Sequence, residues 1–314
     1  MPATPSRPPL PPLLVILAGI LAVSTGSIFV RYAQDYAPSL VVAAYRLSLA
    51  TLFLSPLALS RHRPELRALR GSERLLAILS GLFLALHFAT WITSLEYTTV
   101  ASSVVFVSTA PLWVALLSPL VLKEPLTRPI LGGMGLALLG GLVVGASDSC
   151  SMEGWRMVCA SVGDFVRGKA FWGDVLALAG AWMAAGYLLI GRRLRVRMSL
   201  LPYIFLVYGV AAAALVGLMF LAGQSPIGYP LKAYLWLVLL ALVPQILGHS
   251  SFNWALGYLS AAFVSITLLG EPIGSTVLAY VLLGETPAAF KLIGAILILA
   301  GIYIASRGEA HPRE

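Results

Sequence analysis

The sequence predicts an all-α integral membrane protein whose ten transmembrane helices form two inverted five-helix repeats. Three observations predict this fold: an apolar composition, ten long apolar runs, and a second half that repeats the first. Of the 314 residues, 59% are hydrophobic and only 11% are charged, whereas soluble domains carry about 25% charged residues. A chain of this composition belongs in a lipid bilayer.

The ten apolar runs are separated by charges or by Pro- and Gly-rich stretches. A helix needs about 20 apolar residues to cross the hydrocarbon core of a bilayer. The first run resembles a signal peptide, but the many later runs indicate that it is a retained span. The predicted spans are residues 13–30, 39–59, 75–95, 100–121, 129–146, 172–190, 200–221, 233–256, 260–282 and 289–306.

Lysine and arginine residues are distributed unevenly between the loops on the two faces. With the N-terminus inside, 14 of the 21 lie on the inner face, six lie on the outer face, and Arg46 lies within a span. Basic loops favour the cytoplasmic side of a cell (inner) membrane, so both termini are predicted to be cytoplasmic. The basic composition then reflects topology, and we expect no nucleic-acid partner.

A shift of 161 residues aligns the two halves of the chain. Each copy contains five predicted spans, an odd number, so the second copy must be inverted relative to the first. Inverted repeats are typical of secondary transporters, whose site lies near the midplane between the repeats. The predicted parts are residues 1–146, an extracytoplasmic loop at 147–171, and residues 172–314. The matched pairs include Tyr97 with Tyr258, Pro111 with Pro272, Glu124 with Glu285, Gly133 with Gly294, and Gly140 with Gly301.

The repeated segments also resemble a known family. The chain is similar to the EamA-type exporters of the drug/metabolite transporter superfamily, and it departs from them mainly in the long 147–171 loop. The resemblance implies ten helices in two inverted halves, and the movement of small metabolites, often amino acids, outward. The segments that carry it are PSLVVAAYRLSLA at 38–50, SLEYTTVASSVVFVSTAPLWVALLSPLVLKEPLTR at 94–128, LGEPIGSTVLAYVLLGETP at 269–287 and KLIGAILILAGIYIA at 291–305.

Ionisable residues inside spans are costly, and they usually face a cavity or a partner. Four stand out here, and Glu271 is the most informative because about 11 residues of its span lie on each side of it, which places it near the midplane. It precedes Pro272, whereas the matching position in the first half is Ala110, so the repeat itself does not require the acid. Desolvation favours a protonated carboxyl unless a cation keeps it ionised. The four residues are Arg46, His87, His249 and Glu271.

Polar residues at a spacing of four continue from two of these positions. Side chains four apart share one face of an α-helix, so both stripes are predicted to face a central cavity. The alternatives are interhelical hydrogen bonds without substrate contact and, for Arg46, snorkelling or a structural ion pair. The stripes are Gln245, His249 and Asn253, and Thr267, Glu271 and Ser275.

Aromatic residues add further candidates on the third and sixth spans. Trp91 lies four residues after His87, and Trp182 and Tyr187 lie within the sixth span. Aromatic side chains line pockets for apolar or cationic groups. They also pack against neighbours or form belts at the membrane interface, and that alternative stays open here.

Two features concern assembly rather than the site. Cys150 and Cys159 lie in the extracytoplasmic loop, where an oxidising space favours a disulfide, although two unpaired thiols remain an alternative. A stripe of small residues predicts tight helix packing, either within the chain or across a homodimer. The stripe is Gly133, Ala137, Gly141 and Gly145, and the matched Glu124 and Glu285 are expected to cap span ends.

These patterns favour some functions over others. The chain has no GxxxxGK[ST], HExxH or CxxC motif, so we expect no cofactor and no metal site, and partners limited to a small-molecule substrate and the bilayer. The favoured function is a secondary transporter that exports small amphipathic metabolites such as amino acids, with Glu271 binding a substrate amine or a coupling proton. The alternatives are an uncoupled uniporter or exchanger, and a membrane receptor or scaffold. An intramembrane enzyme using His249 and Glu271 lacks a nucleophile motif, and phosphate-ester transport would need more cavity cations than Arg46.

Overall fold

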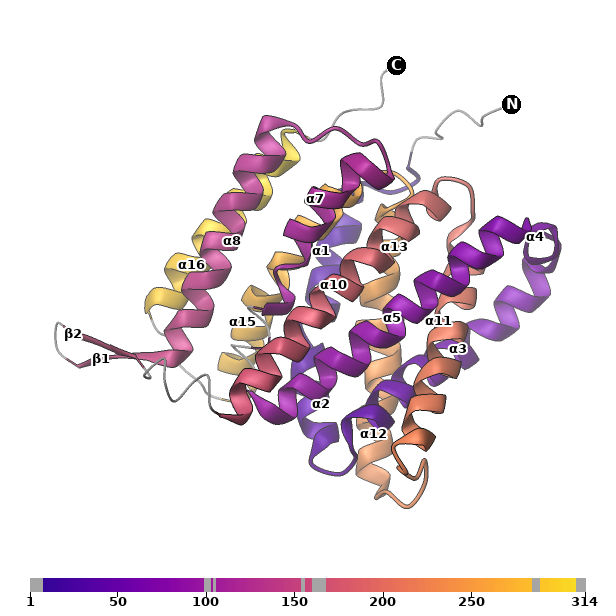
Figure 1. The fold of residues 1–314 in the computed structure, drawn as a ribbon, viewed down its shortest axis with the longest axis horizontal. Helices are drawn as coiled ribbons and strands as arrows, with labels where there is room; N and C mark the ends of the chain where they lie inside the picture. The colour runs from indigo at the N-terminus through magenta and orange to yellow at the C-terminus, as the bar shows by residue number, and fades with distance from the viewer. Residues whose placement is uncertain are drawn as a thin grey trace.

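The helices of the computed structural model lie side by side in one bundle (Figure 1). The structure describes residues 8–98, 103, 106–153, 156–159, 168–283 and 289–308. Glu285, which the repeat matches to Glu124, lies outside these residues.

Helices account for nearly all of the described chain. In the first half they are α1 (Pro12–Val23), α2 (Gly26–Gln34), α3 (Ser39–Arg61), α4 (Arg63–Ala68), α5 (Gly71–Tyr97), α7 (Ala110–Val121) and α8 (Arg128–Ser149). In the second half they are α10 (Lys169–Arg195), α11 (Leu200–Leu221), α12 (Leu231–Leu240), the π-helix η1 (Ala241–His249), α13 (Ser250–Ala255), α14 (Ala261–Thr267), the 3₁₀-helix η2 (Leu268–Gly270), α15 (Glu271–Leu283) and α16 (Ala289–Ser306).

Many of these helices are long and apolar enough to cross a membrane. Among the described residues six qualify by length and composition, and every one coincides with a predicted span. Four further apolar helices of 10–17 residues coincide with the remaining predicted spans. The chain is therefore a multi-pass membrane protein, while ten complete crossings stay a prediction. The six long stretches are Pro12–Gln34, Ser39–Arg61, Gly71–Tyr97, Phe171–Arg195, Leu200–Leu221 and Leu231–Ala255, and the shorter ones are Ala110–Val121, Arg128–Val143, Ala261–Ser275 and Leu292–Ser306.

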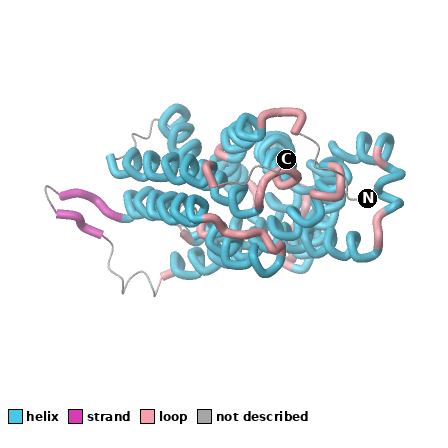
Figure 2. The backbone as a smooth tube through the Cα atoms, turned by 90° about the horizontal axis from the view of Figure 1, so that it is seen from above, coloured by secondary structure: helices cyan, strands magenta, loops and turns pink. Residues whose placement is uncertain are grey.

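The segment between the halves differs from the all-α prediction. It contains a two-stranded antiparallel sheet of β1 (Cys150–Glu153) and β2 (Arg156–Cys159), which projects beyond the helices in Figure 2. Cys150 lies opposite Cys159 in the register. Opposite residues of an antiparallel ladder have Cα atoms about 4.5–5.5 Å apart, a separation that a disulfide can bridge. The hairpin register suits the disulfide, which stays a prediction.

The two halves pack as an approximate two-fold pair. The 161-residue shift carries Ser39, the first residue of α3, onto Leu200, the first residue of α11, and it carries α8 onto α16. In the structure α3 packs against α11 and α8 packs against α16. The contact between α5 and α10 likewise has its counterpart in the contact between η1 and α1. Helices that match in the repeat therefore have matching neighbours, as two-fold symmetry requires.

Glycines allow α8 and α16 to approach at backbone distance. A Cβ atom added at Gly140 would lie 2.6 Å from the carbonyl oxygen of Gly294, and one added at Gly301 would lie 2.5 Å from that of Gly133. The contacts run in opposite directions along the two helices, so α8 and α16 are antiparallel, as inverted copies must be. Figure 1 shows them side by side. We call this contact the glycine seam, defined by Gly133, Gly140, Gly294 and Gly301.

The glycine seam includes part of the small-residue stripe on α8. Gly133 and Ala137 face α16, so this face of α8 is covered within the chain. Gly141 has no atom within 4 Å of where a Cβ would lie, and Gly140 takes the place in the seam that was expected for it. The stripe therefore does not indicate a homodimer, which stays a prediction without this support.

Candidate functional site

A cavity lies between the two halves near the middle of the bundle. The empty space that it encloses, including its opening to the outside, is about 850 Å³. Helices of both halves contribute to its wall. The lining residues are Val23, Gly26, Arg46, His87, Phe88, Trp91, Val107, Ser108, Ala110, Pro111, Ala184, Tyr187, Leu188, His249, Phe252, Leu268, Leu269 and Glu271.

Two broken helices meet at this cavity. In the first half α7 begins at Ala110 and Pro111, after a turn, and in the second half α15 begins at Glu271 and Pro272, after the 3₁₀ turn of η2. Proline suits the first helical positions because its missing N–H needs no partner there. The repeat-related prolines thus interrupt both copies at the same place. Glu271 is the first residue of α15 and follows η2 directly, with helical backbone dihedrals.

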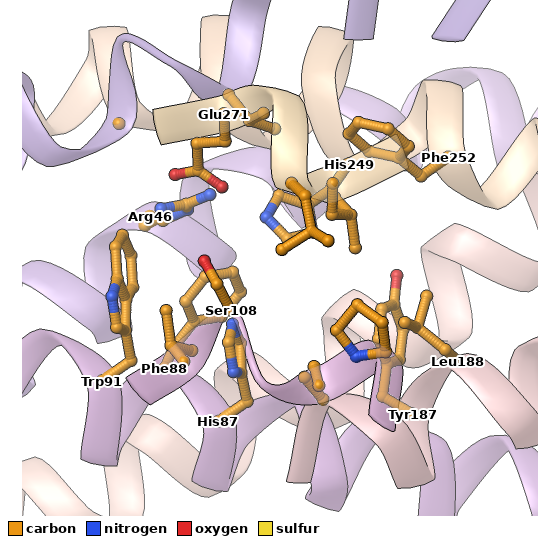
Figure 3. Close-up of a pocket in the computed structure, with 18 residues that line it drawn as sticks. Arg46, His87, Phe88, Trp91, Ser108, Tyr187, Leu188, His249, Phe252 and Glu271 are labelled. Atoms are coloured by element: carbon orange, nitrogen blue, oxygen red, sulfur yellow. The ribbon is translucent and has the colours of Figure 1, made fainter. Parts of the chain in front are cut away.

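Arg46 is buried on α3, with 1% of its surface exposed. Its Nε donates a hydrogen bond to Oε1 of Gln245 at 2.8 Å, and its guanidinium lies over the ring of Phe88, 4.2 Å from the centroid. Its Nη1 is buried and has no hydrogen-bond partner among the described residues. Burial excludes the snorkelling alternative. In Figure 3 the guanidinium and the carboxylate of Glu271 point toward each other.

The two histidines of the cavity lie against aromatic rings. Nδ1 of His87 lies 2.9 Å from the carbonyl oxygen of Gly180, so it donates a proton to that oxygen. The imidazole stacks parallel to Trp91, with an interplanar angle of 2°. His249 meets the edge of Phe88 at a centroid distance of 5.3 Å. Packing thus fixes both imidazoles in the cavity wall.

The first polar stripe does not face the cavity as a unit, because only His249 lines it. Gln245 is fully buried against Arg46. Asn253 is also fully buried; its Oδ1 accepts from the Tyr187 hydroxyl at 2.7 Å and its Nδ2 donates to the Tyr208 hydroxyl at 3.2 Å. Gln245 and His249 do not share a face because Ala241–His249 is a π-helix, whose bonds span five residues, whereas Asn253 lies in the following α-helix α13.

The second stripe separates for a related reason. Between Thr267 and Glu271 the helix tightens to a 3₁₀ turn with three residues per turn, so the two side chains do not share a face. Thr267 is buried and its hydroxyl donates to the carbonyl of Val264. The hydroxyl of Ser275 donates to the carbonyl of Ser24 at 3.0 Å. Of this stripe, only Glu271 lines the cavity.

Trp182 was expected in the cavity and lies elsewhere. It is 46% exposed and meets Trp113 edge to face at 5.3 Å. Tyr187, on the same helix, does line the cavity. A separation of five positions places the two side chains on different faces of α10.

The charged side chains of Arg46 and Glu271 lie at one end of the cavity. Figure 3 shows Glu271, Arg46 and Trp91 on one side, and Phe252, Leu188 and Tyr187 on the other. Sequence reasoning did not select Phe88, Leu188 or Phe252, because an apolar residue in an apolar span gives no signal. Leu188 and Phe252 add apolar surface to the lining, and Phe88 lies under the guanidinium of Arg46.

The sequence model of the EamA-like transporter family matches the chain twice, at residues 10–146 and 171–307. The two matches are displaced by 161 residues, the offset of the internal repeat.

Individual proteins are similar over much of the chain. An "Uncharacterized transporter" of Archaeoglobus fulgidus is 23% identical, covering 93% of this chain and 96% of that protein. A "Probable amino-acid metabolite efflux pump" of Salmonella typhimurium is 30% identical, covering 60% of this chain and 61% of its own. A "Probable terminal-alkyne amino-acid exporter" of Streptantibioticus cattleyicolor is 26% identical, covering 64% and 62%. A solved structure with 19% identity has the same fold, with a TM-score of 0.72 and coverage of 94% and 96%.

Proposed function

Because the chain belongs to the EamA-like transporter family, we propose that it is a secondary transporter that exports small amphipathic metabolites such as amino acids. The two halves rock around the cavity, which opens to each side of the membrane in turn. Glu271 binds the amine of the substrate or a coupling proton. With both termini in the cytoplasm, export carries the substrate away from the face that holds the basic loops.

The pair of broken helices carries this proposal. Secondary transporters bind their substrates where discontinuous helices of two inverted repeats meet near the midplane. Here α7 and α15 begin at matched positions, Ala110 and Glu271, and both residues line one cavity. In both halves a helix begins at this matched position, but only the second half has a carboxylate there.

The names of two relatives support the substrate class. The Salmonella protein is named as a probable efflux pump for an amino-acid metabolite, and the Streptantibioticus protein as a probable exporter of a terminal-alkyne amino acid. An amino acid carries charged groups at one end and a side chain at the other, which suits a cavity with Arg46 and Glu271 at one end and Leu188 and Phe252 at the other.

Glu271→Gln tests this function in proteoliposomes. The probe is the amino acid that gives the largest thermal shift with the purified wild-type protein. We expect Glu271→Gln to reduce its transport at least ~10-fold, since a positioned charge contact contributes about 1.5–3 kcal/mol, and to abolish the dependence of transport on pH. Asp35→Asn removes an exposed carboxylate and serves as the control.

Three outcomes separate the alternatives. Unchanged transport and pH dependence in Glu271→Gln would remove this residue from the mechanism. Wild-type flux that ignores an imposed pH gradient would indicate an uncoupled uniporter or exchanger. A ligand that binds but shows no counterflow would indicate a receptor or scaffold.

A further inference from the structure

We propose that Arg46 binds the anionic end of the transported molecule, so that the site selects solutes carrying one carboxylate beside an amine. This inference rests on the proposed transport function and assigns the groups that recognise the substrate. Arg46 supplies the positive charge, Gln245 orients it, and Glu271 receives the amine.

The free donor of Arg46 is the first observation. The guanidinium has five N–H donors and cannot lose its charge in a protein. Its Nε is bonded to Gln245 and one face lies on Phe88, whereas Nη1 is buried without a partner among the described residues. A buried charged donor without a partner is costly. Since Arg46 lines the cavity, a carboxylate bound there would lie beside a charged group whose buried Nη1 still lacks a partner in the described part of the chain.

Glu271 does not occupy this donor. Both residues line the cavity and their side chains point to the same space (Figure 3). The ion pairs within 4.0 Å among the described residues join His62 to Glu65 and Arg192 to Glu124, so Arg46 and Glu271 are not in direct contact. The guanidinium and the carboxylate lie near each other without contact. This arrangement suits a molecule whose own negative and positive groups are close together.

Gln245 is a positioning residue in this arrangement. It is fully buried and outside the cavity lining, and its Oε1 accepts the Arg46 Nε proton. This contact leaves the outer nitrogens of Arg46 available to a ligand.

The rest of the cavity wall restricts the side chain of the solute. Beyond the charged end lie Leu188, Phe252 and Tyr187 (Figure 3). An apolar or aromatic side chain suits this surface. Among the described residues, the lining holds one arginine and no lysine, so a dicarboxylate or a phosphate ester would leave charge without a partner.

A ligand series on the wild-type protein tests the inference without any mutation. The four probes are L-phenylalanine, L-phenylalaninamide, 3-phenylpropionate and 2-phenylethylamine, with binding followed by thermal shift and transport by counterflow. We expect L-phenylalanine to bind at least ~10-fold more tightly than the amide, since a hydrogen bond to a charged group is worth about tenfold or more. Equal binding of the acid and the amide would overturn the role of Arg46.

Variants then assign the preference to residues. Arg46→Gln should remove the difference between acid and amide, and Glu271→Gln should remove the preference for the amino acid over 3-phenylpropionate. Gln245→Leu retains the charge of Arg46 and should reduce the acid–amide difference without abolishing it. If Arg46→Gln does not fold, the ligand series and Gln245→Leu decide the matter. The assignment of the anion contact to Arg46 would be refuted if Arg46→Gln still preferred the acid over the amide. It would also be refuted if Gln245→Leu showed the same acid–amide difference as the wild type.

The outcomes also separate this inference from the proposed function. Transport of the amide at the rate of the acid would refute the anion contact and leave the transporter in place. Tight binding of L-phenylalanine without counterflow would refute transport and leave the contact in place. If none of the four probes bound to the protein or showed counterflow, the inference would be refuted.

Discussion

Arg192 and Glu124 form an ion pair, with Nε of the arginine 2.6 Å from Oε1 of the carboxylate, that joins the two halves of the protein. The second carboxylate oxygen of Glu124 accepts from the backbone N–H of Ala261, the first residue of α14. Nη1 of Arg192 donates to the carbonyl oxygen of Leu256. One pair thus ties the end of α10 and the segment after α7 to both sides of the turn between α13 and α14. The role expected for Glu124, at the end of a span, is structural.

Breaking this ion pair should weaken the contact between the halves. The two side chains are about one-fifth exposed, at 20% and 21%, so solvent screens them only in part. We expect Glu124→Gln to lower the free energy of unfolding by about 1–3 kcal/mol. A double-mutant cycle with Arg192→Gln in mixed micelles should give a coupling of at least ~0.5 kcal/mol. Additive effects of the two substitutions would show that the pair contributes nothing beyond its separate hydrogen bonds.

The glycine seam should not tolerate a methyl group. In Gly140→Ala the new Cβ would meet the Gly294 carbonyl at 2.6 Å, and both partners are backbone of packed helices. We expect a loss of about 1–3 kcal/mol of stability, as for other overpacked contacts. Gly135→Ala is the matched control, because that Cβ would have no atom within 4 Å and alanine favours a helix by up to about 1 kcal/mol. Unfolding of both variants under the same conditions measures the difference, and equal stability would contradict the seam.

Asn253 should act on stability rather than on substrate. Its amide joins the hydroxyls of Tyr187 and Tyr208, and all three side chains are buried. Asn253→Ala leaves both hydroxyls without this partner, so we expect a loss of about 2–3 kcal/mol. Binding of L-phenylalanine, measured where the variant is folded, should change less than ~3-fold. A variant that is as stable as wild type but has lost binding would place Asn253 in contact with the solute.

The sequence selected the charged part of the cavity well. Arg46, His87, His249 and Glu271 all line it, although their roles in transport stay proposals. Such residues stand out because burying an ionisable group in an apolar span is costly unless a cavity or partner receives it. The internal repeat likewise predicted the matching of α8 with α16, because an alignment offset survives any uncertainty about where a span begins.

The uncharged polar residues were harder to place. Gln245 and Asn253 are four residues on either side of His249, but a π-helix covers much of that stretch. Thr267 is separated from Glu271 by a 3₁₀ turn. Both departures from α-helical spacing follow the local backbone around a proline, and the periodicity of side chains does not reveal them. An amide or hydroxyl also finds a partner on a neighbouring helix at little cost, so its presence in a span carries less information than a charge.

The two copies of the repeat are less free to differ in sequence at the glycine seam than at the cavity. At the seam Gly133 lies on Gly301 and Gly140 lies on Gly294, so each copy meets the other copy's glycines, and a bulky replacement in either copy damages the same contact. At the cavity Ala110 and Glu271 occupy matched positions and face open space. Change in one copy is tolerated there without a matching change in the other. The symmetry of the repeat is thus retained where the helices pack against each other and lost where they line the cavity. At the cavity, a protein built from two equal halves could acquire a charged group in one half alone.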